Sequence, residues 1–304
     1  MPPSIPMPDI NTPYIGRFAP SPTGPLHAGS LVAALASYLD ARANQGHWLV
    51  RIDDIDPPRE QPGASDDILR TLEAHQLLWD GSVSYQSSRF ETYRDIADTF
   101  VANHQAFFCT CSRQQLKDHP IYPGTCRHCN IRPKEAAAIR VISQPVTVEF
   151  DDRIQGLQRQ RMDSDIGDFV IYRKDFLPAY QLATGFDDVD QGITHVVRGC
   201  DLMDSTPRQI YLQQLLGKTP PSYAHLPVLA NANGQKLSKQ NLAAPLPLDA
   251  CAQNLLKALE LLNQRPPTEL LGASCTEILT WATHNWQLAS IPSVTSLRRQ
   301  QPDF

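Results

Sequence analysis

The sequence predicts an α/β fold in which helices cover both faces of a parallel sheet. Residues 14–21 are predicted as a strand that runs into a turn rich in proline and glycine, and residues 30–45 as a helix. Residues 47–56 begin as a buried strand and end in acidic residues. The order strand, helix, strand is typical of a βαβ unit with parallel strands. A further buried strand at 193–202 and a helix at 206–217 continue the pattern.

The first helix and its successor have predicted ends. The Ala- and Leu-rich run at 30–45 has helical spacing, and Gly46 is expected to cap its C-terminus. A second helix is expected over residues 66–78, with Ser65 or Asp66 as its N-cap. From about residue 105, cysteines, prolines and short strand-like runs replace the long helices. This change in composition predicts an insertion between two halves of the sheet.

Composition limits the classes of protein to which the chain can belong. The 304 residues carry a net charge of −5, which argues against a protein that coats nucleic acid nonspecifically, although a local basic groove remains compatible with it. No apolar run reaches the roughly 18 residues of a membrane span, and the first residues lack the features of a signal peptide. We therefore expect a cytosolic protein that makes no contact with a membrane.

Four of the seven cysteines lie between residues 109 and 129, and disulfides are not expected in the cytosol. The spacing Cys-x-Cys followed by Cys-x-x-Cys predicts a four-cysteine zinc site at Cys109, Cys111, Cys126 and Cys129. Zn²⁺ would stabilise an insert that has too little apolar content to fold alone. A closed shell of four ligands indicates a structural metal, and reduced cysteines without a metal are the alternative.

The stretch SPTGPLHAGSLVAAL, residues 21–35, places a histidine where a turn becomes a helix. The start of a helix exposes backbone N–H groups and the positive end of the helix dipole, which together favour an anion. Gly24 and Gly29 would let a ligand approach the backbone, and His27 could donate a hydrogen bond to a phosphate. A solvent-facing histidine in a plain turn is the alternative.

A second motif makes this pattern specific. Residues 236–240, KLSKQ, place Lys236 and Lys239 on a loop after a predicted strand. Together with RFAPSPTGPLHAGS at 17–30, this loop resembles the two nucleotide-binding signatures of class I aminoacyl-tRNA synthetases. The segments RFAPSPTG, RIDDID and VVRGCDL are similar to segments of glutamyl-tRNA synthetases, and the resemblance covers roughly residues 14–245. It implies a Rossmann-type catalytic domain that activates an amino acid with ATP.

Only about sixty residues follow the lysine loop, where a full glutamyl-tRNA synthetase carries an anticodon-binding region. The chain therefore resembles the shortened paralogues of these enzymes, as do its cysteine-bearing insert and DDIDPPRE at 53–60. That resemblance implies activation of L-glutamate with ATP in the absence of tRNA, followed by transfer to queuosine at the wobble position of tRNA(Asp). A shortened glutamyl- or glutaminyl-tRNA synthetase that charges the 3′ end and a non-catalytic RNA-binding paralogue are the alternatives.

The resemblance also implies which residues bind glutamate. Arg17 and Arg198 would bind its carboxylates, because the guanidinium fork matches a carboxylate. Tyr180 and Ser21 would add hydrogen bonds, and Asp53 would bind the ammonium group. The family usually has glutamate at the last position, so the shorter aspartate alters the geometry there. A surface position for Arg17 and an ion pair between Arg198 and Asp201 are the alternatives.

The same resemblance implies which residues bind ATP and the metals. His27, Gly24 and Gly29 would lie along ATP, Lys239 would bind the leaving pyrophosphate, Lys236 would assist or order the loop, and Mg²⁺ would arrive with the nucleotide. In the family pattern a tyrosine supplies the fourth zinc ligand, which favours Tyr122 over Cys129.

We expect a monomer with five segments. These are a disordered lead at 1–12, the first half of the nucleotide-binding domain at 13–104, the zinc-bearing, acceptor-like insertion at 105–190, the second half at 191–244 and a helical C-terminal region at 245–304.

Overall fold

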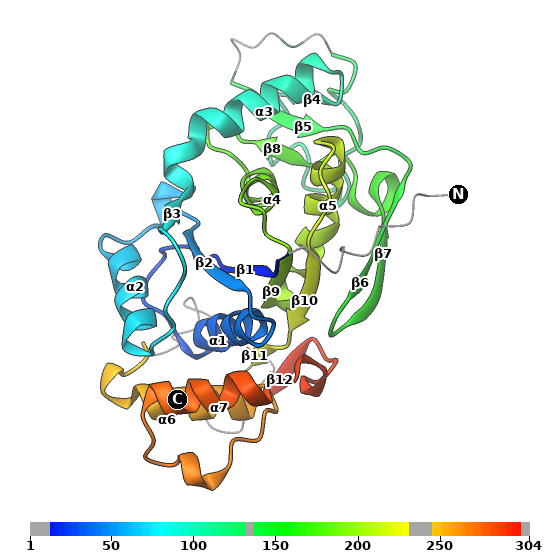
Figure 1. Ribbon diagram of the computed structural model, residues 1–304. Coiled ribbons are helices and arrows are strands. Elements are labelled where there is room, and N and C mark those ends of the chain that lie inside the picture. The colour runs from blue at the N-terminus through cyan, green and yellow to red at the C-terminus, as the bar shows by residue number, and fades with distance from the viewer. Residues whose placement is uncertain (1–12, 130, 132–135, 231–244, 299–304) are drawn as a thin grey trace.

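The structure is a computed structural model that describes residues 13–129, 131, 136–230 and 245–298 (Figure 1). A central sheet of five parallel strands has the order β10-β9-β1-β2-β3. Its strands are β1 (Ile15–Phe18), β2 (His47–Ile52), β3 (Ser84–Tyr85), β9 (His195–Gly199) and β10 (Ser222–Leu226). The predicted α/β fold with a parallel sheet is confirmed. The predicted lead at 1–12 and the lysine loop at 236–240 lie outside the described residues, and the division into five segments remains a prediction.

The strand order reverses at β1. The chain places β2 and β3 on one side of β1 and β9 and β10 on the other. The connections that lead to β2 and to β9 therefore lie on opposite sides of β1. This arrangement leaves a crevice beyond the carboxyl ends of β1 and β9, where doubly wound sheets bind their ligands.

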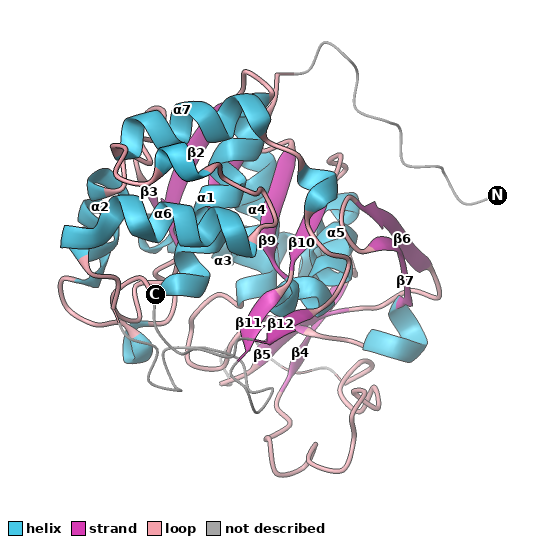
Figure 2. Cartoon of the chain, turned by 90° about the horizontal axis from the view of Figure 1, so that it is seen from below, coloured by secondary structure: helices cyan, strands magenta, loops and turns pink. Residues whose placement is uncertain are grey.

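Two hydrophobic cores lie on the two faces of this sheet. On one face α1 (Ala28–Ala43) packs against β1, β2 and β9, and α6 (Cys251–Leu261) and α7 (Cys275–Asn285) pack on the outside of α1 (Figures 1 and 2). On the other face lie α4 (Tyr180–Asp190) and α5 (Thr206–Leu215). Strand side chains alternate between the cores, so Val197 contributes to the first and Val196 to the second.

The ends of two helices differ from prediction. Helix α1 ends at Ala43, and the N–H groups of Gln45 and Gly46 bond back to the carbonyls of Arg42 and Ala41. Gln45, with φ 55°, takes the left-handed position that was assigned to Gly46. Gly46 is needed for a different reason, since a Cβ there would lie 2.3 Å from the Tyr14 carbonyl oxygen.

Helix α2 (Ala64–Ala74) begins two residues earlier than predicted. Its N-cap is Gly63, with φ 78°, so Ser65 and Asp66 lie in the first turn and the predicted cap is wrong. Side-chain preference alone selected the two polar residues, whereas the left-handed backbone of the turn requires the glycine.

The insertion consists of two small antiparallel sheets that follow α3 (Phe90–Ala102). One contains β4 (Ala106–Cys109), β5 (Ala138–Val141) and β8 (Val170–Tyr172), in the order β4-β5-β8. The other is the hairpin of β6 (Thr147–Asp152) and β7 (Gly156–Arg161), which contacts β10 of the central sheet.

The C-terminal region returns to the sheet. After α7, strand β12 (Ser296–Arg298) pairs in parallel with β11 (Val228–Ala230), which directly follows β10 (Figure 2). The helices that the structure describes include none that combines the length and apolarity of a membrane span.

Candidate active site

A pocket of about 540 Å³ opens at the carboxyl ends of β1, β9 and β10. Its lining comes from the end of β1, the turn after it and the start of α1, together with three later segments: the start of α4, the end of β9 and the end of β10. Six of the predicted site residues line it together, namely Arg17, Ser21, His27, Gly29, Tyr180 and Arg198. The pocket therefore occupies the crevice at which the strand order reverses.

His27 lies where the turn becomes a helix, as predicted, and it is the N-cap of α1, which begins two residues before the predicted start at residue 30. Its Nδ1 accepts a long hydrogen bond of 3.4 Å from the Ser30 N–H, and its Nε2 lies 3.2 Å from the Ser30 hydroxyl. A Cβ on Gly29 would lie 3.2 Å from the imidazole, so the glycine leaves room for the ring to lie over the first turn. Gly24, with φ 134°, shapes the turn but lies outside the pocket lining.

Arg17 is buried and already paired. Its Nε and Nη2 each donate to Asp188 at 3.1 Å, which is a two-pronged ion pair between β1 and α4. Asp188 also accepts from Arg51 Nη1 at 2.8 Å. Although burial raises the pKa of Asp188, the guanidinium charges of Arg17 and Arg51 lower it to about 2. Asp188 is thus ionised at neutral pH, and the surface position considered for Arg17 is wrong.

Asp53 lines a smaller pocket of about 210 Å³ that adjoins the first one, with Ser21, Thr23 and Tyr180 shared by both. One carboxylate oxygen accepts from Arg51 Nε at 2.8 Å, and the other accepts from the Thr184 hydroxyl at 3.2 Å. Burial raises the pKa of Asp53 against the opposing effect of the Arg51 charge. Asp53 is therefore near Ser21 and Tyr180 as expected, and it is held by the buried side chain of Arg51, a contact that the sequence pattern did not indicate.

The side chain of Arg198, which lies on β9, forms part of the pocket wall. It donates from Nε to His225 Nε2 at 3.2 Å and from Nη2 to the Thr206 hydroxyl at 2.7 Å. Its Nη1 lies 3.4 Å from the Tyr180 hydroxyl. This distance is long for a hydrogen bond, so a ligand group could replace the contact. Among the described residues, none of the hydrogen bonds or ion pairs of Arg198 ends on a carboxylate, so the alternative of an ion pair with Asp201 is not found.

Lys236 and Lys239 lie outside the described residues. The described segments on either side of them both reach the pocket. Val228 and Leu229 line it before the gap, and after the gap the Leu246 N–H donates to the carbonyl of Leu26, which also lines it.

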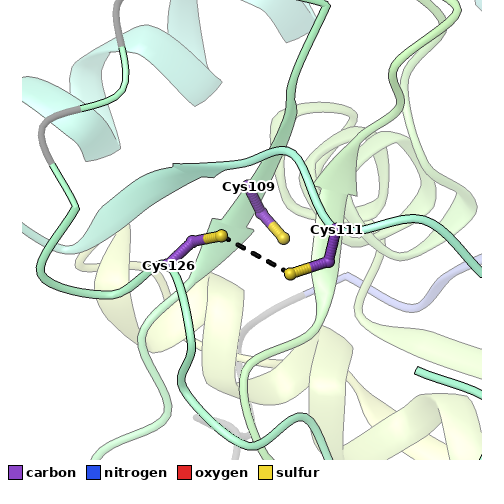
Figure 3. Close-up of side chains that lie close together, drawn as sticks. All are labelled: Cys109, Cys111 and Cys126. Carbon is purple, nitrogen blue, oxygen red and sulfur yellow. Dashed lines mark hydrogen bonds between the residues drawn. The ribbon is translucent and has the colours of Figure 1, made fainter. Parts of the chain in front are cut away.

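Three cysteine sulfurs of the insertion point at one another in Figure 3. The Sγ atoms of Cys109, Cys111 and Cys126 all lie within 4.8 Å of one another, and those of Cys111 and Cys126 are 3.5 Å apart. Thiolates at this spacing can share a single metal ion, and a soft sulfur donor set fits zinc. The cluster could therefore hold a metal ion.

The two candidates for a fourth ligand are placed differently. The Tyr122 hydroxyl lies 3.4 Å from Cys109 Sγ and 3.7 Å from Cys111 Sγ. Cys129 is exposed, and its thiol donates to the Thr125 carbonyl at 3.3 Å. The guanidinium of Arg140 lies over the Tyr122 ring, 4.1 Å from its centroid, and helps to hold the ring in place. These distances favour Tyr122 over Cys129 as the fourth ligand.

Several residues that hold the site together were not found from the sequence. Asp188 and Arg17 are 171 residues apart, and no local motif connects them. The same holds for Arg198 and His225, which come from neighbouring strands of the sheet. A signal was available for Asp188, because a pair of acidic residues, Asp187 and Asp188, interrupts the buried face of a helix.

The fold and the pocket define the class of protein as a class I aminoacyl-tRNA synthetase catalytic domain. The family profile described as tRNA synthetases class I (E and Q), catalytic domain, matches residues 15–247. The chain is 52% identical to glutamyl-Q tRNA(Asp) synthetase of Ectopseudomonas mendocina, over 96% of this chain and 99% of that protein. Proteins of the same name from Pseudomonas aeruginosa PAO1 and Thiobacillus denitrificans are 50% and 49% identical, each over 95% of this chain and 98% of their own length.

The chain belongs to the glutamyl-Q tRNA(Asp) synthetase family and is a ligase. Among solved structures, a glutamate tRNA ligase of Elizabethkingia meningosepticum in complex with its amino acid superposes with a TM-score of 0.77, at 22% identity over 95% of this chain and 67% of that one. The glutamate-tRNA synthetase of Elizabethkingia anophelis gives 0.74, at 23% identity over 95% and 68%. These two similarities show the fold.

Proposed function

We propose that this protein activates L-glutamate with ATP to glutamyl-adenylate without tRNA, and then transfers glutamate to queuosine at the wobble position of tRNA(Asp). The observation that carries the proposal is the pocket at the strand reversal, which gathers two buried arginines, a tyrosine and the start of a helix. The names and nearly complete overlap of the relatives support the same acceptor.

In the first half-reaction, the α-carboxylate of glutamate attacks the α-phosphorus of ATP and pyrophosphate leaves. Negative charge accumulates on the phosphoryl oxygens, so catalysis depends on positioning and on positive potential. His27 and the N–H groups at the start of α1 would face the phosphates. Lys239 would bind the departing pyrophosphate, Lys236 would order its loop, and Mg²⁺ would enter with the nucleotide.

The charged side chains of the site would determine the orientation of glutamate. Arg17 commits Nε and Nη2 to Asp188, and Arg198 commits the same two atoms to His225 and Thr206. In Arg17 both N–H groups of Nη1 would bind a substrate carboxylate, and in Arg198 Nη1 would exchange its long contact with the Tyr180 hydroxyl for the same purpose. Asp53 would attract the ammonium group from the adjoining pocket, where Ser21 and Tyr180 could add hydrogen bonds.

In the second half-reaction, a hydroxyl of the cyclopentene ring of queuosine would attack the carbonyl carbon of the adenylate, and AMP would leave with the bonding electron pair. The proton of the hydroxyl must be passed to a base or to solvent. The product is an ester between glutamate and the modified base of tRNA(Asp).

We also propose that the cysteine cluster holds a structural zinc ion with Cys109, Cys111, Cys126 and Tyr122 as ligands. The convergence of three sulfurs and one phenol oxygen supports this set. Four protein ligands close a tetrahedral shell, so the metal would stabilise the insertion and leave no position for a substrate.

Glutamate-dependent ATP–pyrophosphate exchange in the absence of tRNA tests the first half-reaction. Lys239→Ala should slow the exchange at least a hundredfold. Lys218→Ala is the matched control, because Lys218 precedes the amino end of β10 whereas the pocket lies at the carboxyl ends of the strands, and it should leave the rate unchanged. No exchange under any condition would favour a binding protein, and exchange that requires tRNA would favour an ordinary glutamyl enzyme.

Transfer of labelled glutamate to tRNA(Asp) with and without queuosine tests the second half-reaction. Digestion of the product with ribonuclease should leave the label on the anticodon nucleotide, and tRNA without queuosine should accept none. Label on the 3′-terminal adenosine would overturn the proposed acceptor.

A further inference from the structure

A buried chain of contacts connects the β6–β7 hairpin of the insertion to the pocket. Asp152, the last residue of β6, places Oδ2 2.6 Å from Nδ1 of His225 in β10. On the other side of the ring, Nε2 of His225 lies 3.2 Å from Nε of Arg198 in β9. Asp152, His225 and Arg198 are 2%, 0% and 4% exposed, so bulk water does not compete for these contacts.

The position of the imidazole proton follows from the partners of Asp152. Its other oxygen, Oδ1, accepts from the backbone N–H groups of Ile154, Gln155 and His225 at 2.9–3.1 Å. A carboxylate with this many donors stays ionised. It therefore accepts from a protonated Nδ1, which leaves a lone pair on Nε2. Arginine has donors only, so Arg198 needs such an acceptor.

We infer that Asp152 and His225 are positioning residues that fix the guanidinium of Arg198 towards the substrate carboxylate. The inference rests on the proposed function, in which Arg198 binds glutamate. Thr206 completes the arrangement, because its hydroxyl lies 2.7 Å from Arg198 Nη2 and 3.0 Å from His225 Nε2. With Nε and Nη2 held, Nη1 faces Tyr180 in the pocket.

A neutral imidazole serves a purpose here that a carboxylate would not. Arg17 is bonded directly to the carboxylate of Asp188, which offsets its charge. Arg198 is held by a neutral ring, with the negative charge of Asp152 one residue further away. The ring orients the guanidinium without placing a negative charge directly against it.

The charges around His225 keep it neutral. Burial lowers its pKa, and the positive charges of Arg198 on β9 and Arg17 on β1 lower it further, against the opposing effect of Asp152 on β6. Thr206 on α5 adds no charge. The acceptor lone pair therefore persists throughout the neutral pH range.

Asp152→Asn tests the arrangement with almost no change in size. The amide would donate to Nδ1, which moves the imidazole proton to Nε2, where it would face the N–H of Arg198. We expect the KM for glutamate in pyrophosphate exchange to rise about tenfold or more, while the KM for ATP stays within about twofold. An unchanged KM for glutamate in an enzyme that performs the exchange would overturn the inference.

Asp40→Asn is the matched control. Asp40 on α1 is equally buried and bonds Arg153, the residue next to Asp152, so this variant loosens the same end of the hairpin without contacting His225. We expect a lower melting temperature and an unchanged KM for glutamate. If Asp40→Asn raises that KM as much as Asp152→Asn does, attachment of the hairpin explains the effect and the positioning role is wrong.

A second measurement does not depend on activity. In ¹⁵N-histidine-labelled protein at pH 7, the signal lost in His225→Gln identifies His225, and its two nitrogen shifts report the tautomer. We expect a proton on Nδ1 and none on Nε2. A ring protonated on Nε2 would overturn the inference, even if Asp152→Asn fails to fold. Absence of exchange in the wild type would instead count against the proposed function, and the tautomer would still decide the arrangement.

Discussion

Asp188→Asn should destabilise the protein far more than a change of the same kind two residues along the chain. Asp188 accepts three hydrogen bonds from buried guanidinium groups, two from Arg17 and one from Arg51. Arg51 also pairs with Asp53 and Asp187, whereas among the described residues Asp188 is the ion-pair partner of Arg17. The substitution therefore leaves one buried positive charge without a partner, which typically costs about 3–5 kcal/mol.

Asp190→Asn provides the comparison. Asp190 lies on the same helix and pairs with Arg89, but its side chain is 47% exposed. An ion pair this accessible contributes about 0–1 kcal/mol. Urea unfolding at pH 7, followed by far-ultraviolet circular dichroism, should thus separate the two variants by at least about 2 kcal/mol in the free energy of unfolding. Equal losses in the free energy of unfolding would refute the view that the buried ion pairs of Asp188 with Arg17 and Arg51 stabilise the fold.

The pH dependence gives an independent check of the same reasoning. The pKa of Asp188 is lowered to about 2, from 3.8 for an unperturbed carboxyl. A carboxyl with a lowered pKa contributes stability above its unfolded-state pKa and loses it as the pH falls through the folded value. The difference between wild type and Asp188→Asn should therefore persist down to about pH 4 and shrink towards pH 2. A difference that vanished near neutral pH would contradict the assignment.

Three further outcomes are expected. Tyr122→Phe should lower the zinc content of purified protein measured by atomic emission, whereas Cys129→Ser should keep about one zinc per chain; the reverse pattern would reassign the fourth ligand. Burial lowers the pKa of His195, which is stacked on Tyr14, to about 4. Wild-type stability should therefore fall from about pH 6.5 to pH 4, by at most about 3 kcal/mol. His195→Phe should remove this part of the pH dependence, and an unchanged profile would contradict the assignment. Gly46→Ala should cost about 3 kcal/mol or more in urea unfolding, because the new Cβ would overlap the Tyr14 carbonyl; a cost near zero would show that the strands can separate there without penalty.

Local patterns predicted the parts of the molecule that short segments determine. Helix α1 begins where the turn SPTGPLH ends, because a turn and an apolar helix differ in residue type and in spacing. The cysteine cluster followed from spacing, since its three sulfurs come from one eighteen-residue segment, 109–126. The parallel sheet also followed from the order of elements, whereas the reversal of strand order at β1 was seen only in the structure.

Contacts between distant segments were not accessible to the same reasoning. Nothing near Arg17 in the sequence indicates that Asp188 occupies its fork, and nothing near Arg198 indicates His225. Each pair forms because strands and helices far apart in the chain meet at the same edge of one sheet. The cap of α2 differs for a local reason: Ser65 and Asp66 are residue types that favour cap positions, but the turn before the helix needs the left-handed backbone that Gly63 adopts.

Because β12 pairs with β11, the last part of the described chain supports a strand that contributes to the pocket wall. Val228 lines the pocket, and its N–H donates to the carbonyl of Thr295 at 3.0 Å. The C-terminal helices therefore cannot be exchanged as an independent module. A chimaera that replaced them with another protein's helices would have to supply a strand in the same register, or it would expose an unpaired amide in the wall of the pocket.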